Sequence, residues 1–305
     1  MITGGAGFIG SHLCDRLVQN NEVICLDNLF TGSKQNIRHL IRHENFDFIR
    51  MDVTEINHIE CDIIYHLACP ASPIHYRFNP VKTIKTNVFG TLRILELARE
   101  VKAKVLLTST SEVYGDPEQH PQRESYWGNV NPIGPRSCYD EGKRCAEALV
   151  ADFRQQNGIE TRTVRIFNTY GPRMAIHDGR VVSNFIIHAL KNQDINIYGN
   201  GEQTRSFCYV DDMIDGIISA MHSDYDMPIN LGNPVETTIN ELAETIIKLT
   251  KSKSELKFKS ALKDDPKRRC PDIALAQEVL RWQPMTQLID GLEDTIKYFR
   301  GILSG

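Results

Sequence analysis

The chain has 305 residues, which is enough for one large α/β unit or for two modest domains. Its hydrophobic content of 41% and its charged content of 24% are typical of a globular protein and exclude a disordered chain. The net charge of −4 excludes a general electrostatic attraction to nucleic acid or acidic lipid, so an anionic ligand must meet local positive groups.

The cysteines and the hydropathy pattern indicate the compartment. The 8 cysteines are scattered without a C-x-x-C pair, which is typical of a reducing compartment. No apolar run approaches the roughly 20 residues that span a bilayer. The glycine-rich N-terminal residues lead into the fold and do not form a signal peptide. We therefore expect a cytoplasmic protein with neither a membrane nor a nucleic-acid partner.

The first half of the chain alternates short β-branched runs with helical patterns, which predicts a Rossmann-type doubly wound parallel sheet. The predicted strands are Met1–Thr3, Glu22–Asp27, Phe46–Met51, Asp62–Leu67, Lys104–Ser109 and Thr161–Phe167. The predicted helices are Gly10–Gln19, Asn87–Lys102 and Tyr139–Asn157. The segment Gly115–Cys138 interrupts the alternation, and its length together with its proline and glycine content predicts a functional loop.

After Gly171 the regular alternation is lost, which predicts a smaller mixed α/β C-terminal domain. Its predicted strands are Ile195–Tyr198, Pro228–Leu231 and Glu255–Lys259. Its predicted helices are Val181–Asn192, Asp211–His222, Ile239–Thr250, Asp272–Leu280 and Leu288–Leu303. We expect residues 1–170 to form the first domain, rejoined by about residues 206–222, and residues 171–305 to cover the substrate.

Glycines after the first predicted strand indicate a dinucleotide-binding turn of the form G-x-x-G-x-x-G. Gly4 and Gly7 would let the backbone approach a pyrophosphate, and Gly10 would let the helix pack against the strand. Asp27 ends the second predicted strand, where a carboxylate accepts hydrogen bonds from both ribose hydroxyls and repels a 2′-phosphate. The first domain is therefore expected to bind NAD rather than NADP.

Tyr139 and Lys143 form a Y-x-x-x-K pair on one face of a predicted helix. A lysine ammonium and a positive nicotinamide would both favour the phenolate, so Tyr139 is a candidate base for a sugar hydroxyl. The sequence Thr108–Gly115 follows a strand end, where ligands of open α/β sheets bind.

Ten further segments carry a resemblance to a known family. They are Asp27–Gly32, Pro70–Pro73, Ser109–Pro117, His120–Gln122, Tyr126–Gly128, Asn131–Arg136, Cys138–Arg144, Asn168–Met174, Asp178–Phe185 and Asp264–Pro266. With the turn and the Y-x-x-x-K pair, they make the whole chain similar to the extended short-chain dehydrogenase/reductase superfamily. Within it, the chain resembles the UDP-glucuronate decarboxylase (UDP-xylose synthase) family. Cys69 departs from the serine usual in that family, and we expect little effect.

The resemblance implies decarboxylation of UDP-glucuronate to UDP-xylose through a 4-keto intermediate, with NAD reduced and reoxidised in place. It implies that Tyr139 is the acid/base, Lys143 its electrostatic partner, Thr110 a contact of the reacting hydroxyl and Glu112 a group near the sugar ring. The cofactor-binding residues are then expected to be Gly4, Gly7, Phe8, Ile9, Gly10, Asp27, Asn28, Phe30, Thr31, Gly32, Asp52, Val53, Leu67, Asn87, Tyr139 and Lys143. The substrate-binding residues are expected to be Lys85, Asn168, Arg180, Tyr198, Arg205 and Arg269.

Related reactions leave alternatives. The 4,6-dehydratases carry an aspartate immediately before the glutamate, where this chain has Ser111, and a 4-epimerase has no need of Glu112. A dehydrogenase-decarboxylase that releases the 4-keto pentose shares both residues and stays open. A non-catalytic NAD-binding regulator is disfavoured by the intact Thr110, Tyr139 and Lys143.

The resemblance also implies a homodimer, whose two-fold contact is a four-helix bundle of the helix after Asn87 and the Tyr139–Asn157 helix. Apolar residues available for part of that packing are Leu92, Leu95, Leu97, Ala146, Leu149 and Phe153. We expect no metal ion, because His66, His75 and His120 lack metal-ligand spacing.

Overall fold

The computed structural model describes residues 1–260 and 268–304, so the Asp264–Pro266 segment of the resemblance lies outside the described residues. The chain forms two compact units. The first comprises Met1–Val113, Val130–Arg165 and Ile214–Ile229, and the second comprises Tyr114–Asn129, Ile166–Met213 and Asn230–Gly305. No helix of the described part combines the length and apolar character needed to cross a membrane.

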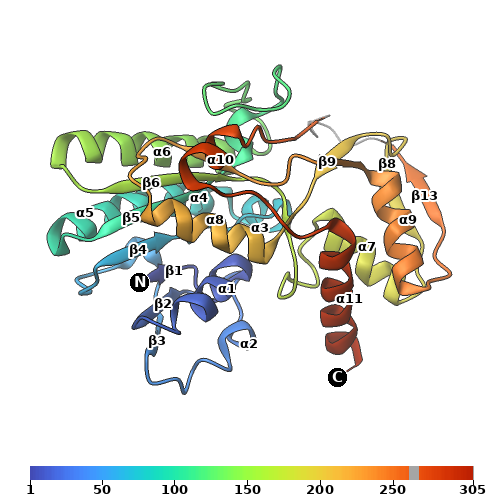
Figure 1. The fold of residues 1–305 in the computed structure, drawn as a ribbon, viewed down its shortest axis with the longest axis horizontal. Coiled ribbons are helices and arrows are strands. Elements are labelled where there is room, and N and C mark those ends of the chain that lie inside the picture. Colours follow the sequence, from blue (N-terminus) through green and yellow to red (C-terminus); the bar gives the residue numbers. More distant parts are fainter. Residues whose placement is uncertain (261–267, 305) are drawn as a thin grey trace. The chain divides into compact units, whose positions relative to one another are not determined.

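Seven strands form the main sheet, in the order β11-β6-β5-β4-β1-β2-β3 (Figure 1). Their bounds are β1 Ile2–Thr3, β2 Val23–Asp27, β3 Phe46–Arg50, β4 Ile63–His66, β5 Lys104–Thr110, β6 Thr161–Ile166 and β11 Ile229–Leu231. The pairs β1–β2, β1–β4, β2–β3 and β4–β5 are parallel. The predicted Rossmann-type sheet is confirmed. One detail was wrong: β11, expected in the smaller domain, is the edge strand of this sheet.

The strands are apolar because both faces of the sheet are covered, as is usual for parallel sheets. Leu26, Ile64 and Val105, from three strands, form one buried cluster with Ile94 and Leu97 of helix α5 (Thr91–Val101). This core holds the carboxyl ends of the strands in fixed positions, where ligand-binding side chains of such sheets lie.

The helices of the sheet-containing part begin at different residues from those predicted. Their bounds are α1 Phe8–Leu17, α2 Lys34–Ile37, α3 Pro73–Phe78, α4 Pro80–Lys85, α6 Ser137–Asn157 and α8 Val210–His222. The helix predicted at Asn87–Lys102 is the C-terminal part of a longer helical segment. A π-helical turn, η2 (Thr86–Gly90), joins α4 directly to α5 in this segment. Asn79 caps the start of α4 by accepting from the Lys82 amide at 3.0 Å, a start signal missed in the sequence.

The described part of the second unit contains short strands and several helices. Its strands are β7 Thr169–Tyr170, β8 Ile195–Tyr198, β9 Thr204–Ser206, β10 Cys208–Tyr209, β12 Glu236–Thr238 and β13 Leu256–Lys259. Its helices are α7 Val181–Leu190, α9 Ile239–Thr250, α10 Ala274–Leu280 and α11 Leu288–Ser304. The pairs β7–β10 and β8–β13 are parallel, and β9–β12 is antiparallel. Strands β7, β9, β10 and β12 were not predicted, because two or three residues are too few to show a period.

The long segment after β5 is folded and hydrogen-bonded. It begins with a 3₁₀ turn, η3 (Ser111–Tyr114). Asn129 then donates its backbone amide to the Tyr114 carbonyl at 2.9 Å, and its own carbonyl accepts from Asp116 at 3.0 Å. The segment 115–129 therefore closes on itself as a compact loop, which we call the Gly115 loop.

Candidate active site

The glycine turn after β1 leaves no room for side chains. Gly4 has φ of +72°, and a Cβ atom on Gly10 would lie 2.2 Å from the Gly4 carbonyl oxygen, which is a backbone atom that cannot move aside. Gly7 precedes α1, and no side chain caps the first turn of that helix. The turn therefore leads closely into a helix N-terminus without a side-chain cap, which suits a diphosphate.

Asp27 lies beside this turn at the end of β2 and is almost fully buried. Its carboxylate accepts from the Ala6 amide at 3.0 Å and from the Leu29 amide at 2.7 Å. Burial raises the pKa of Asp27, and these two hydrogen bonds oppose the rise. A Cβ atom on Gly32 would lie 2.8 Å from the carboxylate, so the following loop passes directly over it.

A second carboxylate, Asp52, lies beside the first strand end. Asn28 donates to it at 3.0 Å, and Lys82 of α4 forms an ion pair with it at 2.6 Å. Asp52 also caps the 3₁₀ turn η1 (Val53–Glu55), and Val53 is buried beneath Gly90, whose Cβ would lie 2.7 Å from it. The ends of β2 and β3 and the helix α4 therefore meet at one place.

The remaining predicted cofactor residues surround the same strand ends. Leu67 follows β4 and donates its amide to the Thr3 carbonyl at 3.1 Å. Phe30 is exposed, and its ring centroid is 6.3 Å from that of Phe78. Phe8 and Ile9 are half-buried in the first turn of α1, and Thr31 is exposed.

Tyr139 of α6 is buried at the end of β5. Its ring stacks on Tyr76 with centroids 5.0 Å apart and planes 6° from parallel. Burial raises the pKa of the Tyr139 phenol. The neighbouring Cys69, Glu112 and Asp140 raise this pKa further, and a hydrogen bond with Thr110 lowers it in part. Without ligands the phenol is therefore protonated. The expected bias toward the phenolate must come from a bound cation, because burial dominates here.

Lys143 lies one helical turn after Tyr139 and is also buried. Its ammonium donates to the Thr108 carbonyl at 2.8 Å. Burial lowers the pKa of Lys143, and Cys69 and Glu147 oppose the shift. Asn87 of η2 is packed so closely that a Cβ on Gly142 would lie 2.8 Å from its amide nitrogen. The structure therefore brings Asn87, Tyr139 and Lys143 to the end of β5.

Glu112 lies in η3 and is almost buried. Its amide donates to the Thr110 hydroxyl at 3.3 Å. Its carboxylate is paired with the guanidinium of Arg136, which also lies 3.8 Å from Asp140. Sequence reasoning missed Arg136, although its place three residues before Tyr139 was the available signal.

Cys69 lies closer to the reactive groups than expected. It packs against the stacked pair Tyr76 and Tyr139 together with Cys138. Burial raises the pKa of the Cys69 thiol to about 11, so it is a neutral group there. It also contributes to the pKa values of Tyr139 and Lys143.

The second unit holds two buried arginines, Arg205 and Arg269. Arg205 lies on β9 and donates to the Thr204 carbonyl at 2.8 Å. The Ser206 hydroxyl donates to the Arg269 carbonyl at 3.4 Å, which ties the two segments together. Asn168 precedes β7, and its carbonyl accepts from the backbone of β10. These groups supply positive charge and polar atoms of the kind that binds a diphosphate.

The other predicted substrate residues are Arg180, Tyr198 and Lys85. Arg180 is paired with Asp178 at 2.5 Å at the start of α7. Tyr198 is half-exposed at the end of β8, and its carbonyl accepts from Gln203 at 2.7 Å. Lys85 is exposed at the end of α4 in the first unit.

The histidines considered for metal binding have separate environments. His66 is a neutral core residue: burial lowers its pKa to about 3, and its ring contacts the hydroxyls of Thr3 at 2.8 Å and Thr91 at 3.1 Å. His75 contacts the Ser72 hydroxyl at 2.7 Å. His120, by contrast, lies beside a carboxylate and a thiol, a grouping that sequence spacing did not reveal.

Comparisons with known proteins agree over nearly the whole chain. The family model described as GDP-mannose 4,6 dehydratase matches residues 1–295. UDP-glucuronic acid decarboxylase 6 of Arabidopsis thaliana is 62% identical over 294 residues, which is 96% of this chain and 86% of the relative. UDP-glucuronic acid decarboxylase 1 of Xenopus tropicalis is 56% identical over 301 residues, which is 98% of this chain and 72% of the relative.

Solved structures of nucleotide-sugar 4-epimerases match the fold over nearly the whole chain at lower identity. UDP-glucuronic acid 4-epimerase of Bacillus cereus, in complex with UDP-glucuronic acid and NAD, is 28% identical with a TM-score of 0.87, covering 99% of this chain and 98% of that one. UDP-glucose 4-epimerase of Thermotoga maritima is 30% identical with a TM-score of 0.89, over the same shares of the two chains. The family model and the relatives each cover nearly the whole chain, and the chain belongs to the UDP-glucuronic acid decarboxylase family within the wider GDP-mannose 4,6 dehydratase family.

Proposed function

We propose that this chain is an NAD-dependent enzyme that decarboxylates UDP-glucuronate to UDP-xylose. The observation that carries the proposal is the grouping of Thr110, Glu112, Tyr139 and Lys143 at one end of β5. The Arabidopsis and Xenopus relatives are named UDP-glucuronic acid decarboxylases, and the Bacillus cereus neighbour holds UDP-glucuronic acid together with NAD. Substrate, cofactor and side chains are therefore consistent with one another.

The first unit fits NAD. The glycine turn has no space for a Cβ at Gly10, and the N-terminus of α1 that follows has no side-chain cap and suits a diphosphate. Asp27, held at the end of β2, suits the ribose hydroxyls and opposes a 2′-phosphate. Bound NAD supplies a positive charge, a hydride acceptor and, after reduction, a hydride donor.

Tyr139 acts first in this proposal. Thr110 shares a hydrogen bond with the phenol, so a sugar hydroxyl placed between them can pass its proton to Tyr139. Loss of that proton must accompany loss of hydride from C4, since oxidation to a ketone removes both. Lys143 supports the phenolate by charge, and its own position is set by the Thr108 carbonyl.

The second step is the loss of carbon dioxide. Once C4 is a ketone, the C5 carboxylate is β to a carbonyl, and the electron pair of the breaking bond flows into an enolate. The carboxylate is already ionised at neutral pH, so no further base is required. What the protein must supply is orientation, because the bond must stand perpendicular to the ketone plane, and such positioning is worth several kcal/mol.

Glu112 is assigned to this later stage. Its carboxylate is held by Arg136, so it has a fixed direction in the site. From there it can hold the ring or manage a water molecule for protonation at C5. The UDP part is assigned to Asn168, Arg205 and Arg269, with Lys85, Arg180 and Tyr198 as further contacts.

A second candidate reaction is oxidation and decarboxylation with release of the 4-keto pentose. NMR of the product formed from UDP-glucuronate, with catalytic NAD and no added NADH, distinguishes the two. UDP-xylose in stoichiometric yield supports the proposal. A 4-keto product that accumulates with NADH contradicts it, and absence of carbon dioxide release contradicts both reactions.

We infer that the protein is a cytoplasmic homodimer. All eight cysteines are free, as suits a reducing compartment; they are Cys14, Cys25, Cys61, Cys69, Cys138, Cys145, Cys208 and Cys270.

The dimer contact must use other apolar residues than some of those predicted, because Leu95, Leu97 and Ala146 are buried inside the chain itself and cannot contribute. Apolar side chains remain exposed on α3, α4 and η2, namely Ile74, Phe78, Val81, Ile84 and Phe89, and a second copy would cover them.

A further inference from the structure

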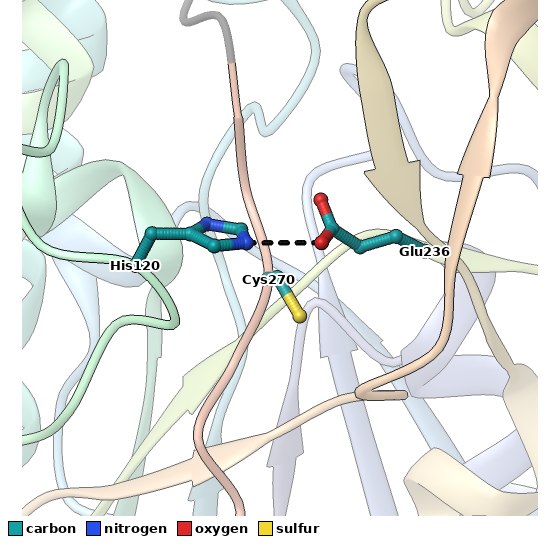
Figure 2. Close-up of side chains that lie close together, drawn as sticks. All are labelled: His120, Glu236 and Cys270. Carbon is teal, nitrogen blue, oxygen red and sulfur yellow. Dashed lines mark hydrogen bonds and ion pairs between the residues drawn. The ribbon is translucent and has the colours of Figure 1, made fainter.

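Three metal-ligating side chains that have no role in the proposed reaction converge in the second unit. They are His120 of the Gly115 loop, Glu236 at the start of β12 and Cys270, and we call them the His120 cluster. Their ligand atoms all lie within 4.8 Å of one another. Figure 2 shows the Cys270 sulfur beside the hydrogen bond that joins His120 Nε2 to the Glu236 carboxylate at 2.9 Å.

The backbone holds the cluster in place. Two residues after His120, the Gln122 amide donates to the Cys270 carbonyl at 2.9 Å, and the Gln122 side chain accepts from the Cys270 amide at 2.9 Å. Glu236 pairs with Ser206 across the β9–β12 ladder, and its second oxygen accepts from the Thr204 hydroxyl at 2.5 Å. The ligand-bearing segments are therefore positioned without any ion, as a binding site requires.

The donor set favours one class of ion. An imidazole, a carboxylate and a thiol offer nitrogen, oxygen and sulfur, the set that zinc binds at about 2.0–2.3 Å. Calcium and magnesium prefer oxygen alone. His120 and Glu236 keep 26% and 28% of their side chains exposed, so an ion and a water molecule can reach the site from solvent. A tetrahedral ion would replace the His120–Glu236 hydrogen bond, because both atoms that form this bond would become ligands of the ion.

We propose that His120, Glu236 and Cys270 bind one zinc ion, with a water molecule as the fourth ligand. Binding breaks the S–H bond of Cys270, forms a zinc–sulfur bond and releases the proton to solvent. Arg268 places a positive charge near Glu236, which opposes a divalent cation, and the negative charge of the thiolate would offset it. The ion would join the Gly115 loop, β12 and the segment that carries Arg269.

The test uses the full chain, stripped with a chelator and titrated with zinc against a chromophoric competitor. Cobalt replaces zinc in a parallel titration, since a thiolate on tetrahedral cobalt gives a near-ultraviolet charge-transfer band. We expect one equivalent to bind with this band. We expect Cys270→Ser to abolish the band and to weaken zinc binding by more than about 100-fold, which exceeds the effect of changing a neighbour of a ligand.

His58 provides the matched control, because it contacts the carboxylates of Glu60 and Glu100 at 2.7 and 2.8 Å but has no cysteine in that grouping. His58→Asn should leave zinc affinity and the cobalt spectrum unchanged. Circular dichroism verifies the fold of each variant, and Glu236→Gln and His120→Asn should each weaken zinc even if Cys270→Ser misfolds. Wild-type protein without the thiolate band, or retained affinity in Cys270→Ser, would overturn the proposal.

Discussion

At the scale of single residues, the charge around Tyr139 is the property on which the proposed reaction depends. Burial keeps its phenol protonated, and two carboxylates, Glu112 and Asp140, add to that effect. Arg136 lies beside both carboxylates, and its backbone carbonyl oxygen accepts a hydrogen bond from the Tyr139 amide at 2.9 Å. One arginine thus connects the base of the first step to the carboxylate of the second.

Variants of Tyr139 and Glu112 should stop the reaction at different steps. Tyr139→Phe removes the base, so we expect no NADH absorbance and a loss of turnover of about 100-fold or more. Glu112→Gln keeps the base, so oxidation should proceed and then stall with enzyme-bound NADH or a 4-keto sugar. Stopped-flow absorbance and mass spectrometry of quenched reactions measure both. Wild-type turnover by Glu112→Gln would show that its assigned role is wrong.

Arg136 should act through Glu112. Arg136→Met leaves the Glu112 carboxylate without its partner, so we expect kcat to fall by about 10- to 100-fold with a smaller change in KM. Arg136→Lys restores a charge and should recover part of kcat. The control is Arg93→Met, because Arg93 pairs with Glu96 on the exposed face of α5. Equal loss in the methionine and lysine variants would contradict a role through charge.

At the scale of elements, the start of α1 and the end of α4 shape the cofactor site. The glycine turn leads from β1 into α1, whose first turn has no side-chain cap, so the N-terminus of this helix suits an anionic ligand. Helix α4 reaches the end of β3 through Lys82, whose ammonium meets Asp52 at 2.6 Å. Both helices therefore contribute to the site only where they meet the carboxyl ends of the strands.

Gly10→Ala should damage the turn. Its Cβ would meet the Gly4 carbonyl at 2.2 Å, so the backbone must shift, and we expect NAD affinity to fall at least about 10-fold. Isothermal titration with NAD measures the loss. Gly301→Ala is the control: nothing lies within 4 Å of its Cβ in α11, so the unfolding free energy should stay the same or rise by up to about 1 kcal/mol. Unchanged NAD affinity in Gly10→Ala would refute the assignment of the turn.

The Lys82–Asp52 pair should make stability depend on pH. Burial alone would raise the pKa of Asp52, but hydrogen bonds from Lys82, Thr54 and Asn28 outweigh it and lower the pKa well below its usual range. A depressed carboxyl pKa stabilises the fold above the unfolded value of about 4, and this contribution disappears as pH falls below it.

Lys82→Met should therefore lower the unfolding free energy at pH 7, by less than about 1 kcal/mol because Lys82 is partly exposed. The difference from wild type should shrink as the pH is lowered below about 4, since Asp52 of the folded variant, which has lost the Lys82 charge, is protonated at a higher pH than Asp52 of the folded wild type. Asp52 titrates alike in the two unfolded chains, so the unfolded state does not contribute to the difference. Urea unfolding between pH 3 and pH 7 measures it. A difference that grows toward low pH would contradict the sign of this effect.

At the scale of the whole molecule, several large apolar side chains of α3, α4 and η2 are exposed and are not covered by the rest of the chain. Phe78 is 79% exposed, and Val81 and Phe89 are also more than half exposed on neighbouring elements. Such a patch on a monomer marks an interaction surface. The patch lies on α3, α4 and η2, which precede α5 in the chain. The expected dimer contact would therefore include these elements as well as the helices of the four-helix bundle.

We expect a homodimer by light scattering at micromolar concentration. Phe89→Glu together with Phe78→Glu should produce a monomer, because each places a charge in the contact. Ile302→Glu is the control, since Ile302 is exposed near the end of α11. A wild-type monomer, or a double variant that stays dimeric, would contradict this contact.

The sequence by itself determined the Rossmann-type sheet, because alternating apolar strands and helices with a glycine turn have few other solutions. It also determined the identity of the reactive pair, since Tyr139 and Lys143 are four residues apart on one helix and meet by local geometry alone. For the same reason helix α9 was predicted with its observed bounds, Ile239–Thr250.

Only the tertiary structure decided which distant residues meet. Arg136 reaches Glu112, and His120 reaches Glu236 and Cys270, across up to 150 residues of chain, and no local period predicts such pairs. The protonated state of Tyr139 was likewise unpredictable, because burial depends on every element packed around it. The spacing of residues in the sequence predicts contacts within one helix or strand. Burial and long-range pairing cannot be predicted in this way, because they arise only when the elements pack together.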